Sequence, residues 1–63
     1  MKVQAKTTIK VLYNDKMITT FEKGKEYNAR KREYFGYSVE NELKENNLFC
    51  DEAFSKNFKI LLE

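Results

Sequence analysis

The sequence predicts a mainly β protein: a small five-stranded barrel with one short helical turn near residues 51–57, in a single domain over residues 1–63. Three observations predict this fold. Apolar residues alternate with polar ones in several short runs, which is the period of a half-buried strand. Turn-forming residues separate these runs. Many short strands in a chain of only 63 residues favour closure into a barrel, because a closed sheet leaves no unpaired edges.

The first half of the chain contains the clearest alternation. Residues 3–13 place small, β-branched and aromatic side chains on one parity and mostly polar ones on the other, which predicts one long strand. Asn14-Asp15 tolerates positive φ and predicts a tight hairpin turn before a strand over residues 17–21. Gly24 supplies a second turn. The polar run of residues 27–33 is typical of an exposed edge strand.

The second half contains three more β-rich runs, over residues 34–39, 48–50 and 58–62. An exposed turn is expected over residues 41–47. Asp51 is a suitable N-cap for a helical turn over residues 52–57. A helix over residues 39–47 is the competing interpretation, but it offers only Val39 and Leu43 as apolar anchors.

The composition excludes the disulfides and zinc sites that stabilise many small proteins. The chain has one Cys and no His, so it can form neither an internal disulfide nor a Cys/His zinc site. We therefore expect no metal and no cofactor, and the five Phe and four Tyr must supply the core. The expected core rings are Phe21, Tyr27, Phe35 or Tyr37, Phe49, Phe54 and Phe58.

The remaining reactive side chains do not indicate an enzyme. The carboxylate pairs Glu40/Glu42 and Asp51/Glu52 would lie on solvated turns, and a barrel this small has little room for a substrate pocket. The acidic residues near position 42 lack the spacing and glycine of a calcium loop. Cys50 is expected to be a buried structural residue rather than a nucleophile.

We expect neither an export signal nor a membrane-spanning segment in this chain. Its N-terminal residues lack the apolar run of a secretion signal, and no stretch approaches the ~18 apolar residues needed to span a membrane. A lone thiol fits a reducing compartment. These features predict a cytoplasmic protein without membrane partners.

Charge is unevenly distributed along the chain. Residues 1–32 contain nine Lys and Arg against three Asp and Glu, whereas residues 33–63 contain three against seven. The fold either separates these halves into a basic and an acidic face, or it pairs their charged side chains so that the electrostatic fields of the two halves cancel.

The order of motifs resembles a known family. Phe21-x-x-Gly24-Lys25-x-Tyr27 precedes an aromatic strand, an acidic turn, the short strand at Leu48-Phe49, a helical turn with Phe54 and the terminal Phe58-Lys59-Ile60. Over residues 1–62 this order resembles the small SH3-like barrel proteins of bacteriophages and prophages of low-GC Gram-positive bacteria. The resemblance implies an SH3-like barrel in the cytoplasm of a bacterial host cell. It also implies a binding or inhibitory protein without catalytic residues.

One segment is a candidate partner-binding site. Five cations and two tyrosines gather within residues 23–37: Lys23, Lys25, Arg30, Lys31, Arg32, Tyr34 and Tyr37. Exposed Tyr beside Arg is typical of protein–protein contacts, which makes a protein the expected partner. The alternative is a small β-barrel that binds nucleic acid through this basic and aromatic segment. An ordinary solvated edge strand would have similar residues, and strand addition at such an edge would give a weak homodimer instead of a monomer.

Overall fold

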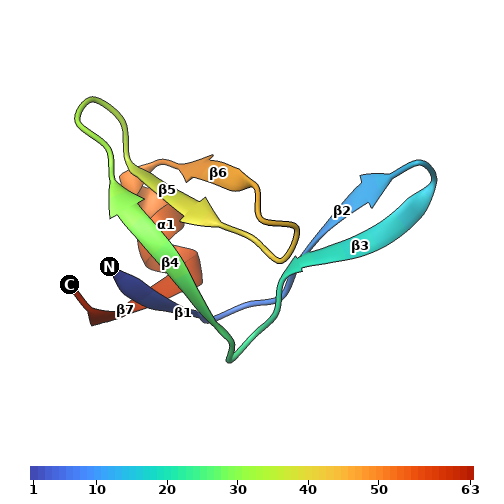
Figure 1. Cartoon of the computed structure of the whole chain (residues 1–63), viewed down its shortest axis with the longest axis horizontal. Helices are drawn as coiled ribbons and strands as arrows, with labels where there is room; N and C mark the ends of the chain where they lie inside the picture. Colours follow the sequence, from blue (N-terminus) through green and yellow to red (C-terminus); the bar gives the residue numbers. More distant parts are fainter.

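A computed structural model of the chain describes all residues from 1 to 63 and contains seven strands and one short helix (Figure 1). Strands account for 54% of the residues, which confirms a mainly β protein. In chain order the elements are β1 (Lys2–Ala5), β2 (Ile9–Tyr13), β3 (Lys16–Phe21), β4 (Glu26–Lys31), β5 (Tyr37–Glu40), β6 (Asn46–Phe49), α1 (Asp51–Asn57) and β7 (Phe58–Leu62).

The strands form two sheets. Five of them make an antiparallel sheet in the order β6-β5-β4-β1-β7, and β2 and β3 make a separate two-stranded ribbon. The outer strands β6 and β7 do not pair with each other, so no closed barrel is found. Figure 1 shows the β2–β3 ribbon projecting away from the larger sheet, while α1 lies behind β4 and β5.

The prediction of one long strand over residues 3–13 was wrong. The chain bends at residues 6–8, so that β1 joins the large sheet and β2 starts the ribbon. The end of α1 holds this bend, because the Lys6 N–H donates to the Asn57 carbonyl at 2.7 Å and the Thr7 hydroxyl donates to Asn57 Oδ1 at 2.8 Å. The alternation continues unbroken through the bend, which explains why the sequence pattern alone did not reveal it.

The hairpin turn was predicted correctly. Asn14 and Asp15 have φ of 50° and 63°, the left-handed conformation of a two-residue turn that matches strand twist. Leu12 and Met17 face each other across the ribbon and are both largely exposed. The base of the ribbon is anchored in the body by buried Phe21.

The prediction of an edge strand over residues 27–33 was also wrong. β4 lies inside the sheet, with Tyr27 opposite Val3 of β1 and Ala29 opposite Val39 of β5. Its polar residues alternate with buried Tyr27 and Ala29, so the polar composition reflects one solvated face of the strand and not an open edge.

The second half of the chain is shifted slightly from its prediction. The expected strand over residues 34–39 begins only at Tyr37, because residues 33–36 form a bend. The exposed turn covers residues 41–45, with residues 46–47 already in β6, and Asn41 is buried rather than exposed. The Asn41 side-chain oxygen accepts N–H groups from Leu43 and Glu45, so the chain forms a compact turn there instead of a helix.

The helix was predicted at the right place but with the wrong cap. Cys50, not Asp51, is the N-cap, and its sulfur accepts the Ala53 N–H at 3.4 Å. The expectation of a buried Cys50 was therefore wrong, since a side chain that caps this short surface helix stays exposed.

Rings fill the core as expected. Phe21 meets Tyr27 and Phe58 edge to face at centroid distances of 4.9 and 5.2 Å, while Phe54 stacks on Tyr37 at 3.7 Å. Such pairs add about 0.5–1.5 kcal/mol each beyond the area they bury. The buried apolar residues are Val3, Ala5, Phe21, Tyr27, Ala29, Val39, Phe54 and Phe58. Tyr37, not Phe35, is the ring that packs against this core.

Candidate binding surfaces at the two ends of strand β4

The strand β4 divides the basic segment into two separate groups. Lys23 and Lys25 lie in the turn before β4, whereas Arg30, Lys31 and Arg32 lie at its far end. A six-residue strand spans about 20 Å, so these groups do not form one surface.

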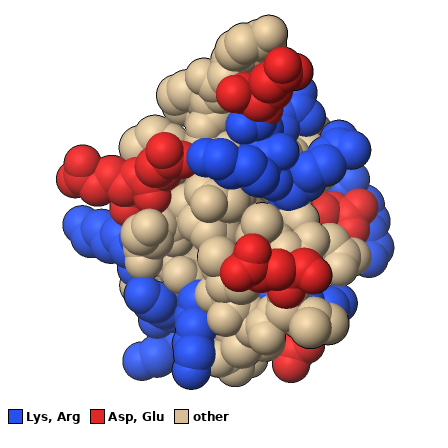
Figure 2. Space-filling model, turned by 90° about the vertical axis from the view of Figure 1, so that its left-hand side faces the viewer, with Lys and Arg blue, Asp and Glu red and all other residues tan.

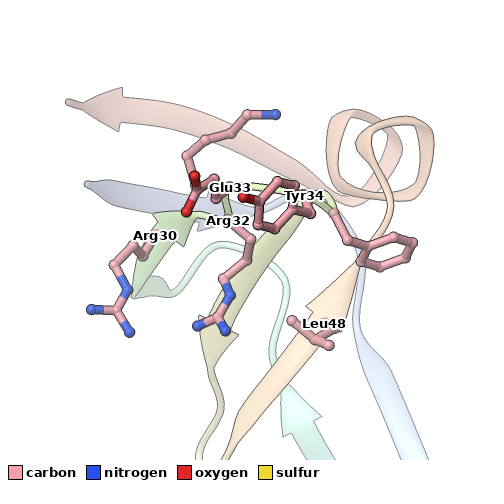
Figure 3. Close-up of a pocket in the computed structure, with 7 residues that line it drawn as sticks. Arg30, Arg32, Glu33, Tyr34 and Leu48 are labelled. Carbon is pink, nitrogen blue, oxygen red and sulfur yellow. The ribbon is translucent and has the colours of Figure 1, made fainter.

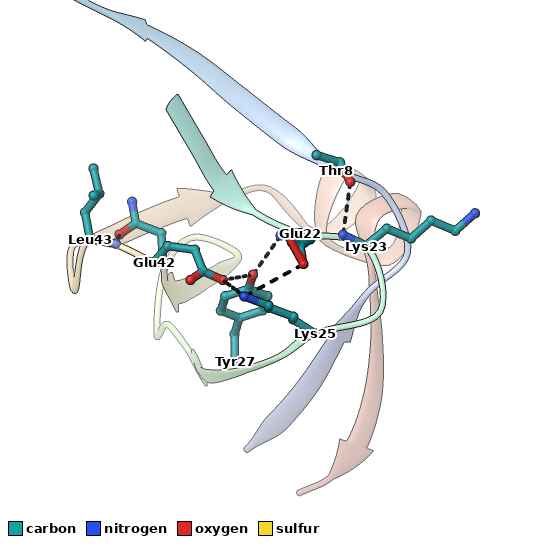
Figure 4. A network of polar contacts seen from close by, with 8 residues as sticks. Thr8, Glu22, Lys23, Lys25, Tyr27, Glu42 and Leu43 are labelled. Carbon is teal, nitrogen blue, oxygen red and sulfur yellow. Dashed lines mark hydrogen bonds and ion pairs between the residues drawn. The ribbon is translucent and has the colours of Figure 1, made fainter. Parts of the chain in front are cut away.

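Of the first group, Lys25 belongs to a polar network with Glu22, Tyr27 and Glu42, here called the tyrosine network (Figure 4). Lys23 lies beside it, and its backbone N–H donates to the Thr8 hydroxyl. The Tyr27 hydroxyl donates to Glu42 Oε2 at 2.5 Å and accepts the Glu22 N–H at 2.7 Å. Lys25 Nζ lies 3.7 Å from Glu42 Oε2 and 3.8 Å from Glu22 Oε2. The polar groups of this network therefore satisfy one another.

The tyrosine network changes the acidity of its central residue. Burial, and next the hydrogen bond to the Glu42 carboxylate, raise the pKa of Tyr27 from 10.0 to about 12. The Glu22 N–H has the opposite, weaker effect, because it stabilises the phenolate. Tyr27 thus remains a neutral hydrogen-bond donor that joins the start of β4 to the β5–β6 turn.

Lys31 also has partners within the fold. Its ammonium lies 4.7 Å from the centroid of the Tyr37 ring and 3.2 Å from Asp51 Oδ1 at the start of α1. Both contacts lie on the face of β4 that packs toward α1, since Lys31 is opposite Tyr37 in the sheet.

Arg30 and Arg32 lie on a shallow hollow lined by residues 30–35 and Leu48, here called the arginine hollow (Figure 3). Figure 3 shows the two guanidinium groups pointing to the same side, with Leu48 close to Arg32. The three ion pairs of the molecule involve only Lys25 and Lys31 as cations, so neither arginine is paired.

Apolar side chains border these arginines and are uncovered. Tyr34 is 92% exposed, Leu48 61% and Phe35 53%. The sequence singled out Tyr34 but not Leu48, which reaches the hollow only because β6 pairs with β5. Phe35 was a core candidate, and it lies outside because it precedes β5 in the bend.

The exposed bend is nevertheless built on a fixed backbone. Gly36 has φ +44°, and a Cβ at this position would overlap the backbone carbonyl of Phe49. The Arg32 N–H donates to the Gly36 carbonyl at 2.8 Å, which closes the bend. Tyr34 and Phe35 are therefore presented on a tightly packed turn.

Charge pairing between the halves of the chain occurs in the fold. Two of the three ion pairs, Lys25–Glu42 and Lys31–Asp51, join the basic first half to the acidic second half. Figure 2 shows basic and acidic side chains interleaved on the face it presents. Of the two alternatives left open by the sequence, these observations favour cancellation over two opposed faces.

The structure holds no group of three or more His, Cys, Asp or Glu side chains placed to bind a metal ion. Its single helix is too short to cross a membrane. Comparisons with protein families, curated proteins and solved structures find no significant match to this chain.

Proposed function

We propose that this protein is a non-enzymatic binding module that recognises another protein through the arginine hollow. The observation that carries the proposal is the uncovered pair Tyr34 and Phe35 beside the unpaired Arg30 and Arg32. Tyr and Arg are among the residues most enriched where alanine substitutions weaken protein complexes. Because the backbone of this turn is already held in place, binding costs little further backbone entropy.

The absence of catalysis is part of the same proposal. The carboxylates of Glu42 and Asp51, both in the candidate acidic pairs, are engaged with lysines. The thiol of Cys50 caps a helix. The arginine hollow is an open surface depression, which suits contact with a macromolecule better than enclosure of a substrate.

We further propose that the chain is an SH3-like domain of the phage or prophage type, acting on a host or phage macromolecule in the bacterial cytoplasm. Its chain order supports this: β1, a projecting hairpin, the β4–β5–β6 meander, a short helix, and β7 returning to pair with β1. This order agrees with the motif order on which the resemblance rests.

Affinity capture tests the binding function. The tagged protein is used to capture partners from host-cell lysate, alongside the variant Arg32→Ala/Tyr34→Ala. The matched control, Lys10→Ala/Leu12→Ala, also removes one cation and one large exposed side chain, but from the β2–β3 ribbon. We expect a specific protein to be captured by the wild type and the control and lost from the arginine-hollow variant. Circular dichroism establishes that all three chains are folded.

Two outcomes of that capture contradict the assigned surface. Undiminished capture by Arg32→Ala/Tyr34→Ala would show that the hollow is not the contact. Loss of capture only with Lys10→Ala/Leu12→Ala would move the contact to the ribbon.

Nucleic-acid binding through residues 23–37 is the second candidate, and the unpaired Arg30 and Arg32 favour it. Two observations weigh against nucleic-acid binding. Strand β4 separates the basic residues into two groups, and Lys25 and Lys31 already pair with carboxylates. Phosphate contacts release counterions, so affinity for single-stranded or duplex oligonucleotides would fall steeply with salt. Absence of a mobility shift at low salt removes this candidate.

A further inference from the structure

The two arginines of the hollow have unused hydrogen-bonding capacity. A guanidinium carries five N–H donors arranged as a fork that fits a carboxylate in a two-point contact. No side-chain hydrogen bond or ion pair within the chain occupies Arg30 or Arg32. Folding therefore leaves both forks available for an external acceptor.

The spacing of the arginines suggests the shape of that acceptor. Arg30 lies opposite Ser38 in the β4–β5 pair, and Arg32 follows two residues later where its N–H still bonds to Gly36. Two residues along an extended chain cover about 7 Å, and both guanidinium groups point to the same side in Figure 3. An extended peptide places its alternate side chains at the same interval, so two carboxylates at alternate positions match the two forks.

An apolar contact lies beside these forks. Ser38 is opposite both Arg30 on β4 and Leu48 on β6, so Arg30 and Leu48 lie on the same face of the sheet. Leu48 and Phe35 are both more than half exposed. An apolar side chain next to the acidic pair of a ligand would cover Leu48 and exclude water from the guanidinium contacts.

Resting on the proposed function, the geometry points to the chemistry of the partner: the arginine hollow binds an extended acidic segment of a protein, with carboxylates at alternate positions and a neighbouring aliphatic side chain. Glu33 lines the same hollow, and Glu40 lies on the same face near Arg30. These carboxylates reduce the positive potential around the two arginines. A long polyanion such as nucleic acid would meet both carboxylates, whereas a short segment with two acidic residues need not.

The test is a titration of the ¹⁵N-labelled full chain, followed by backbone amide chemical shifts. The probe is the synthetic peptide Gly-Leu-Glu-Thr-Glu-Val-Gly with blocked termini, and its control replaces both Glu by Gln. We expect the acidic peptide to shift the amides of Arg30, Arg32 and Leu48 saturably, and the Gln peptide to shift them little. The Lys23 and Lys25 amides at the other end of β4 should not move.

A charge-matched pair of variants isolates the arginines. Arg30→Gln/Arg32→Gln should weaken peptide binding about tenfold, since each of the two lost carboxylate contacts at this exposed site contributes about threefold. Lys56→Gln/Lys59→Gln removes the same charge from exposed positions on α1 and β7 and should leave binding unchanged.

Three results would contradict the proposal that the arginine hollow binds an acidic segment. They are equal shifts with the Gln peptide, equal binding by Arg30→Gln/Arg32→Gln, and tighter binding of a single-stranded oligonucleotide to the same amides.

Affinity capture distinguishes a failure of the acidic-ligand proposal from a failure of the proposed binding function. If a partner is captured through Tyr34 and Arg30→Gln/Arg32→Gln captures as much, the binding function holds and the acidic ligand is wrong. If no protein is captured, the binding function itself is wrong.

Discussion

The two ends of β4 are built from the same kinds of residue and use them differently. Each end has a glycine with positive φ, basic residues, a tyrosine and a glutamate. At the first end Lys25, Tyr27 and Glu42 bond to one another, whereas at the second end Arg32 and Tyr34 have no side-chain partners. Composition therefore does not distinguish the two turns. They differ in whether their side chains have hydrogen-bond or ion-pair partners within the fold.

The largest expected difference in stability loss is between substitutions of the two glycines, Gly36 and Gly24. Gly36→Ala should cost about 3 kcal/mol or more, because its Cβ would overlap the Phe49 carbonyl and its φ is positive. A chain of this size has only about 3–5 kcal/mol of stability, so this variant should retain no more than about 2 kcal/mol at 25 °C. Gly24→Ala meets open space at φ +90° and should cost about 1–2 kcal/mol. Urea unfolding measures both, and equal losses would contradict the fixed backbone inferred for the second end.

The next largest difference in stability loss is expected between substitutions of Tyr27 and Tyr34. Tyr27→Phe removes the donor to Glu42 and the acceptor for the Glu22 N–H, so it should destabilise the fold by about 1–2 kcal/mol. Tyr34→Phe removes a hydroxyl that faces solvent and should change stability by less than about 0.5 kcal/mol. Thermal unfolding of the two variants compares them directly. A similar loss in both would mean that the tyrosine network contributes nothing.

Alkaline pH should weaken the first end selectively. The pKa of Tyr27 is raised from 10.0 to about 12 in the folded state, so folding favours the neutral hydroxyl. The resulting stabilisation is complete below pH 10 and is lost as the pH rises from 10 to about 12. Other groups titrate in this range, so the measurement is the difference in unfolding free energy between wild type and Tyr27→Phe. That difference should shrink across the window, and a constant difference would argue against the raised pKa.

The smallest expected effect concerns the cations. Lys25→Gln breaks two partly exposed ion pairs and should cost about 0.2–1 kcal/mol at low salt. Arg32→Gln breaks none and should leave stability unchanged while weakening partner binding. Urea unfolding at low and high salt distinguishes them, since screening should reduce only the cost of Lys25→Gln. A loss of stability in Arg32→Gln would show that the arginine end is structural after all.

Features set by neighbouring residues could be predicted from the sequence. The Asn14-Asp15 turn and the helix at residues 51–57 depend on local backbone preferences, and both formed where expected. The rings of Phe21, Phe54 and Phe58 are buried, as expected for a small chain that has no disulfide or structural metal and needs large aromatic area in its core.

Features set by distant pairing could not be predicted. The bend at residues 6–8 depends on a hydrogen bond to Asn57, and the interior place of β4 depends on pairing with β1. The candidate site shows the same limit. Arg30, Arg32 and Tyr34 are close in sequence and were found, whereas Leu48 joins them only through the register of β5 with β6.

The β2–β3 ribbon offers a site at which this protein can be labelled. Its tip at Asn14-Asp15 is exposed and projects away from the five-stranded sheet in Figure 1. Exposed hairpin tips tolerate insertions well. A residue inserted between Asn14 and Asp15 to carry a fluorophore or biotin should therefore allow the protein to be immobilised for the capture experiments, with both turns that flank β4 left unmodified.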